Sequence, residues 1–296
     1  MMKRALLLLS LLAVPCVVTS CKDDAAPGTA TATESPLDKL CKLLKLYGYS
    51  DAQIKIFRAG YEGDTATLGN LKNKDFIGIY CMGAATAGNI ELVMQCLDKG
   101  ADPDDGLVGA AWGGHMEIVK LLLDKGADAF DYGLAYAAWG GHMEIVQLML
   151  SKGATDYDLG LYNAAECGHL DIVQLLLSKG ATDYNLGLEG AVYSGHMEIV
   201  QLMLEKGANP NAGFYSAAIL GRAEIIKILL AQPGIDVNQK ESSGSIIEKI
   251  LLAQPGIDVN QKKSSGSTAL DEAVDKGHIE CIELIRAAGG KRGKEL

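Results

Sequence analysis

DDGLVGAAWGGHMEIVKLLLDKG, from Asp104 to Gly126, decides the fold because the chain repeats it. Asp131–Gly153 reads DYGLAYAAWGGHMEIVQLMLSKG, and Asp158–Gly180 and Asn185–Gly207 carry the same pattern again. The histidine of the pattern recurs every 27 residues, at His115, His142, His169 and His196. A fixed period of roughly 20–50 residues is typical of repeat architectures. The sequence therefore predicts a solenoid, in which each unit packs only against its neighbours.

One unit has the pattern of two short antiparallel helices. In residues 158–180, Asp158 is the expected N-cap of the first helix, Gly168 makes the turn, and Gly180 ends the second helix. The apolar positions keep helical spacing, at Leu161, Ala164 and Ala165 and then at Ile172, Val173, Leu175, Leu176 and Leu177. Such a unit cannot bury its apolar face alone, so about three or more units must stack.

Less regular copies flank the central stretch. We expect N-terminal capping helices and an irregular repeat in residues 36–72, and the repeat array in residues 73–290. Near its end, Leu229–Lys240 and Leu251–Lys262 are identical, which indicates a duplicated insert near residues 241–262. The copy supplies an outer helix, at about Ile246–Ala253, without an obvious inner partner. The sequence leaves open whether this segment is a half-repeat bulge or a loop.

The pattern AAxxGHxEIVxLLLxxGA resembles the ankyrin repeat, and the resemblance covers roughly residues 50–290. It implies an all-α, ankyrin-like helical solenoid of about eight short repeats of the 27-residue type. Ankyrin repeats run to about 33 residues and open with TPLH, whereas here Asp/Asn-x-Gly-Leu takes that place and only STAL, at 267–270, is similar to it. The residues that each 27-residue unit lacks, relative to the longer family repeat, lie where the family has its β-hairpin. We therefore expect short turns, little strand and no binding by hairpin tips in residues 104–207.

The N-terminus has the pattern of an export signal. A basic start and a short apolar run lead to Val18-Thr19-Ser20-Cys21. This tetrapeptide resembles the bacterial lipobox, which implies that residues 1–20 are a lipoprotein signal peptide and that Cys21 becomes the lipidated N-terminus. An ordinary cleaved signal with an incidental cysteine is the alternative. The small, polar residues up to 35 complete a flexible tether over 21–35, and residues 291–296 form a C-terminal tail.

Charge and residue spacing argue against several classes of function. The net charge of −10 and the lack of a basic stripe argue against a nucleic-acid partner. Histidines one repeat apart lie on helices about 8–10 Å apart, too far to share a metal ion, so we expect them to be hydrogen-bonding residues at helix starts. Of the seven cysteines, Cys81, Cys96 and Cys281 take core positions, and no CxxC spacing occurs. We expect no metal, no cofactor, no disulfide framework and no catalytic set.

The informative positions vary while the frame around them stays fixed. Two residues follow each Ala-Ala pair, and the resemblance implies that they face the concave groove and contact a partner. On this basis the candidate partner-binding residues are Trp112, Trp139, Glu166, Tyr193 and Ile219. Tyr162 and Tyr215 start the same helices and extend the patch. Trp and Tyr are common interface hot spots, although these aromatics also suit a simple role of covering the gap left by absent hairpins.

These observations favour a non-enzymatic protein that binds another protein in the groove of a monomeric solenoid and holds a membrane through its N-terminal lipid. We expect it in the bacterial cell envelope, either on the periplasmic side of a membrane or on the outer cell surface. The sequence does not distinguish an envelope scaffold from a toxin-neutralising protein. The alternatives are a hydrolase with its site in the divergent terminal regions, and a surface receptor for a host encounter.

Overall fold

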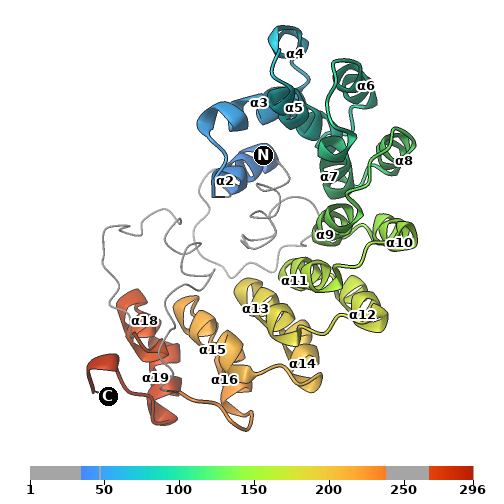
Figure 1. The fold of residues 1–296 in the computed structure, drawn as a ribbon. Helices are drawn as coiled ribbons and strands as arrows, with labels where there is room; N and C mark the ends of the chain where they lie inside the picture. Colours follow the sequence, from blue (N-terminus) through green and yellow to red (C-terminus); the bar gives the residue numbers. More distant parts are fainter. Residues whose placement is uncertain (1–34, 47, 238–266, 296) are drawn as a thin grey trace.

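The computed structural model describes residues 35–46, 48–237 and 267–295, and these residues form paired α-helices (Figure 1). The inner helices are α3 (Asp51–Glu62), α5 (Lys74–Thr86), α7 (Pro103–Gly113), α9 (Phe130–Gly140), α11 (Tyr157–Cys167), α13 (Tyr184–Ser194), α15 (Pro210–Ile219) and α18 (Ala269–Lys276). Their outer partners are α4 (Thr65–Asn70), α6 (Ile90–Asp98), α8 (Met116–Asp124), α10 (Met143–Lys152), α12 (Leu170–Lys179), α14 (Met197–Glu205), α16 (Ala223–Leu230) and α19 (Ile279–Ala287). The described ranges contain no β-strand. The expected all-α solenoid of about eight repeats is confirmed.

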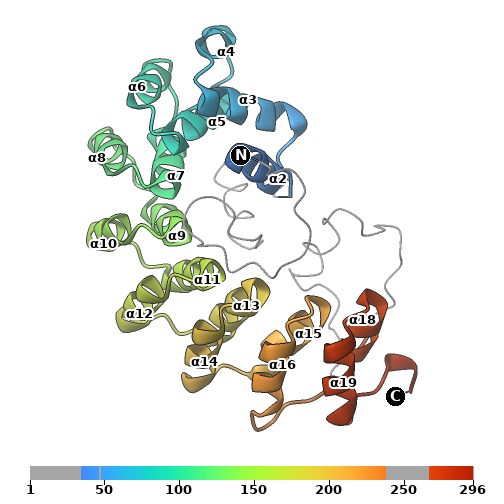
Figure 2. The same cartoon turned by 180° about the vertical axis from the view of Figure 1, so that it is seen from behind.

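The pairs form an arc, with one row of helices on the concave side and the other on the convex side (Figures 1 and 2). The inner helices stack directly on one another from α3 to α15, and α18 continues the row. One further helix, α2 (Pro36–Leu46), precedes the pairs and packs against α3 on the concave side in both views. The signal segment 1–20, Cys21 and the tether up to residue 34 lie outside the described residues.

The apolar stripes form one continuous core between the two rows. Leu134 of α9 and Val146 of α10 are fully buried, and their equivalents are buried in the neighbouring repeats. Gly168 and Gly180 lie in the left-handed region at φ 76° and 108° and end α11 and α12, as expected. Cys81, Cys96 and Cys281 are buried core residues, which confirms their expected place.

The expected N-cap Asp158 was wrong. Asp156 caps α11, because its Oδ1 accepts a hydrogen bond from Leu159 N at 3.2 Å. Asp158 lies inside the helix, and its Oδ1 instead accepts hydrogen bonds from Thr182 N (2.7 Å) and Asp183 N (2.9 Å) in the next repeat. An aspartate that resembles a local cap therefore joins two repeats.

This aspartate contact recurs along the array. Asp104 accepts hydrogen bonds from Asp128 N and Ala129 N, and Asp131 does so from the two backbone amides one repeat further on. Asn185 and Asn211 take the same role with one amide each. Before α9, α11, α13 and α15, the contacts satisfy backbone donors at the helix start, which would otherwise lack a partner within the helix.

The aspartate and asparagine contacts form one series along the array, the aspartate ladder. The histidines form a second series, the histidine ladder. Each ring reaches back to the last turn of the preceding inner helix, as where His142 Nε2 lies 3.0 Å from the Trp112 carbonyl oxygen. The other rungs join His115 to Thr86, His169 to Trp139, His196 to Glu166 and His278 to Ile219. Arg222 occupies the equivalent place and donates from Nη2 to Tyr193 O at 2.9 Å. The histidines thus stand at helix starts and form hydrogen bonds, but they bond the neighbouring repeat and do not cap their own helices.

The duplicated segment does not interrupt the stacking. Helix α18 packs beside α15, and α19 packs beside α16, although residues 238–266 lie between them in the chain. The rung from His278 Nε2 to Ile219 O measures 2.8 Å. The second copy and its expected helix at Ile246–Ala253 lie outside the described residues.

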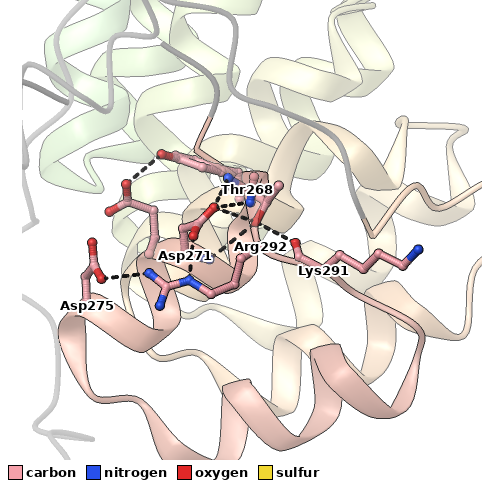
Figure 3. A network of polar contacts seen from close by, with 8 residues as sticks. Thr268, Asp271, Asp275, Lys291 and Arg292 are labelled. Carbon is pink, nitrogen blue, oxygen red and sulfur yellow. Dashed lines mark hydrogen bonds and ion pairs between the residues drawn. The ribbon is translucent and has the colours of Figure 1, made fainter. Parts of the chain in front are cut away.

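The C-terminal residues close the last repeat through a polar network (Figure 3). Asp271 of α18 accepts hydrogen bonds from Arg292 Nε and from Gly293 N, each at 2.7 Å, and Thr268 Oγ1 donates to Lys291 O at 2.8 Å. Burial alone would raise the pKa of Asp271, but these hydrogen bonds and those from Thr268 outweigh it and hold that pKa at about 2. Residues 291–293, assigned above to a tail, therefore pack against α18.

The histidine contacts predict that two glycines, both with positive φ, differ in how well they tolerate substitution. A Cβ on Gly141 would lie 2.5 Å from His169 Cε1, whereas a Cβ on Gly153 would meet nothing within 4 Å, and both residues have positive φ. Gly153→Ala should therefore show backbone strain alone. Gly141→Ala should lose about 2 kcal/mol more of unfolding free energy, because the histidine ring must shift. Urea unfolding followed by circular dichroism measures both, and equal losses would contradict the packing role of the ring.

Candidate protein-binding surface

The candidate residues occupy one face of consecutive inner helices. On α13, Glu189 and Tyr193 are four residues apart and so share a face, and α11 and α15 place Tyr162 with Glu166 and Tyr215 with Ile219 in the same way. Figure 1 shows these helices on the concave side. Trp112 and Tyr215 are half-buried, while Trp139, Tyr162, Glu166, Tyr193 and Ile219 are buried. Of the predicted contact residues, Trp112 and Tyr215 are therefore the more accessible ones.

An aromatic cluster, formed by Trp112, Tyr136 and Trp139, joins α7 to α9. The two indole rings stack with centroids 5.0 Å apart and an interplanar angle of 6°. Tyr136 lies against both, at 6.1 Å from Trp112 and 5.8 Å from Trp139. Burial raises the pKa of Tyr136, so its ring acts as a neutral packing partner. Trp112 and Trp139 were in the predicted set, whereas Tyr136 was absent from it.

Asp105 is a buried carboxylic acid near the start of α7. It starts the face of α7 that carries Trp112, and its side chain covers Gly78 of α5. Burial, and then the nearby charges of Asp102, Asp104 and Asp75, raise the pKa of Asp105 to about 7. Sequence reasoning missed this residue, although the acidic run at 102–105 was a visible signal.

The other end of the surface combines tyrosines with carboxylates. Glu189 is half-buried, and burial followed by the charge of Asp183 raises the pKa of Glu189 to about 7. Glu166 is only 1% exposed on the neighbouring helix. Tyr215 donates from its hydroxyl to Glu272 Oε1 of α18 at 3.1 Å. The three glutamates and the tyrosines around them form an acidic sector on α11, α13, α15 and α18.

The described residues offer little for catalysis. All five histidines hold a backbone carbonyl through Nε2. The five described cysteines are buried, and the hydrogen bond between the Cys81 thiol and Cys96, together with burial, raises the pKa of that thiol. No three His, Cys, Asp or Glu side chains in the described ranges are placed to hold a metal ion. None of the helices described has the length and apolar character needed to cross a bilayer.

Comparison with protein families identifies the repeats. The model for ankyrin repeats (3 copies) matches at residues 81–160, 107–187 and 134–213. Together these matches cover residues 81–213, which are similar to ankyrin repeats. Among solved structures, the crystal structure of the human ASB11 ankyrin repeat domain is similar, with 20% identity and a TM-score of 0.46, over 71% of this chain and 98% of that one. A search of curated protein sequences finds no match.

The raised pKa of Asp105 predicts that removing its charge increases the unfolding free energy by an amount that depends on pH. The folded pKa lies above the unfolded value of about 4, so this group's contribution to stability is intact below pH 4 and falls as pH rises towards 7. Asp105→Asn should therefore raise the unfolding free energy by about 2–4 kcal/mol at pH 8. The gain should vanish at pH 4.

Thermal unfolding at the two pH values provides the measurement. The control is Asp128→Asn, which makes the same chemical change at an exposed loop position and should leave stability unchanged at both. A gain for Asp105→Asn that is equal at pH 4 and pH 8 would show that packing, not charge, is responsible.

Proposed function

We propose that this protein is a non-enzymatic lipoprotein of the bacterial cell envelope, whose ankyrin array holds another protein on its concave face. The observation that carries the binding proposal is the row of half-buried side chains, Trp112, Glu189 and Tyr215, set on stacked inner helices. Large aromatic side chains on a rigid surface lose little conformational entropy on binding, which makes them effective anchors.

The repeats themselves support an interaction role. A stacked array is a rigid support, because each inner helix from α7 to α11 is joined to the next repeat by a contact of the aspartate ladder and one of the histidine ladder. The same ladders occupy the histidines, which leaves no described histidine as an obvious general base. A preformed surface of this kind suits recognition, because little must be ordered when the partner binds.

The anchor is proposed from the sequence around Cys21. Lipidation at that residue would tie the chain to a membrane, and two or more acyl chains give stable attachment. The residues up to 34 would then separate the lipid from α2, whose first turn begins at Pro36. This arrangement would leave the array in the aqueous phase beside the membrane.

The binding proposal is tested by affinity capture from envelope extract with the full chain in detergent. Trp112→Ala combined with Tyr215→Ala removes two half-buried rings, and should abolish capture of the partner held by the unchanged protein. The control removes two exposed apolar side chains from the convex side, Met94→Ala and Ile279→Ala, and should capture as before. Helicity must match in all three proteins. Equal capture by all three would place binding away from the concave face.

The anchor is tested by substitution of the predicted lipid acceptor. Cys21→Ala should move the protein from the membrane fraction to the soluble fraction, because the acyl chains are lost. Cys16→Ala makes the same change five residues earlier and should remain with the membrane. Retention of Cys21→Ala on membranes after a carbonate wash would exclude lipidation at this residue as the anchor.

A further inference from the structure

The described charges are divided between the two sides of the array. The inner helices α7, α9, α11, α13 and α15 contain no Lys or Arg. Their acidic side chains are Asp104, Asp105, Asp131, Asp158, Glu166 and Glu189. The lysines of this part of the chain are on the outer helices or at their ends, at Lys120, Lys125, Lys152, Lys179, Lys206 and Lys227. The central inner helices therefore carry acidic side chains and no basic ones, whereas the outer helices carry both signs and Arg222, at the start of α16, reaches back to Tyr193 O.

Three of these aspartates are already engaged, because Asp104, Asp131 and Asp158 accept the backbone hydrogen bonds of the ladder. Glu189 differs, since it is half-buried at the centre of the acidic sector. The charged group that acts on it is Asp183 at the start of its own helix, and α11, α13 and α15 contain no Lys or Arg. The raised pKa of Glu189 shows that the fold gives this carboxylate little stabilisation as an anion.

The aromatic cluster, like the carboxylates, attracts positively charged groups. The faces of Trp and Tyr rings carry negative charge density, and they attract Lys and Arg side chains within about 6 Å of the ring centre. Trp112 is half-buried and is held flat against Trp139, so its ring is fixed before a partner arrives. One surface therefore combines aromatic faces with carboxylates, and both favour a positively charged ligand.

We propose that the segment of the partner bound on the concave face is a basic peptide, with Arg or Lys side chains that meet Glu189 and the face of Trp112. This inference rests on the proposed concave-face binding and names its ligand class. Helices packed about 8–10 Å apart place α7 and α13 about 24–30 Å apart along the row. An extended peptide spans that distance with about eight residues, so cations at both ends of such a stretch reach both contacts.

Three labelled synthetic peptides of 12 residues test this inference by fluorescence anisotropy with the full chain in detergent. They share Leu and Ser positions and carry Arg, Gln or Glu at two positions eight residues apart. The Arg peptide should bind at least about tenfold more tightly than the Glu peptide. Its affinity should fall as salt rises from 0.05 to 0.5 M, since exposed charges are screened.

Two matched variants locate the charge. Glu189→Gln should weaken binding of the Arg peptide about tenfold, with little effect on the Gln peptide. Glu144→Gln makes the same change at an exposed position on α10 and should leave both affinities unchanged. Circular dichroism and thermal unfolding confirm that both variants are folded, and Glu189→Gln should not be destabilised, because it removes a poorly stabilised anion.

The outcomes separate this inference from the proposed function. Equal binding of all three peptides, or none by any, overturns the basic-peptide inference, as does an equal effect of Glu189→Gln and Glu144→Gln. A further outcome is that the unchanged protein still captures a partner that the Trp112→Ala/Tyr215→Ala variant does not. In that case binding on the concave face stands, and the ligand belongs to another class. If capture is insensitive to those rings as well, the surface itself is wrongly placed.

Discussion

A pair of short helices exposes apolar surface on both sides, so no pair in this protein is complete without its neighbours. The contact that fixes one pair on the next is the approach of a histidine ring to a glycine and a carbonyl of the preceding repeat. His169 shows this, with its ring against Gly141 and its Nε2 at 3.2 Å from Trp139 O. A glycine there serves two needs at once, because the turn requires positive φ and the ring requires the space. The position of each inner helix, and of the side chains it presents, depends on this contact.

The two ladders act at opposite ends of the inner helices. The aspartates hold the N-terminal end, as at Asp131, and the histidines hold the C-terminal end, as at His142. The inner helices from α7 to α11 are thus held at both ends, and the concave side of this part of the array is correspondingly rigid. This accounts for the nearly parallel stacking of Trp112 on Trp139, which come from equivalent positions in successive repeats.

Much of the fold follows from the sequence because its signals are local and repeated. The 27-residue period and the glycines at 168 and 180 fix the helix pairs and where they end. The role of Asp158 could not be predicted in this way, because Asp156 has the same chemistry two residues earlier and the partner amides belong to another repeat. The candidate surface was harder still. Position within a repeat placed Glu166 and Trp139 on the concave side, but only packing between repeats shows that they are buried. Tyr136 was missed because its equivalents are Gly109 and Asn163, so the pattern marked no aromatic position there.

The hydrogen bond between His278 and Ile219 joins residues 59 positions apart in the chain, whereas the equivalent bonds join residues 29 or 30 apart. Its distance of 2.8 Å is nevertheless similar to theirs. Chain length between two helix pairs therefore does not govern how they dock. Contacts act only between nearest neighbours, so an insertion at a connection leaves the geometry on either side unchanged. A copied segment can accumulate substitutions there without being selected for packing, and such connections are places where a repeat protein can acquire new sequence while it continues to fold.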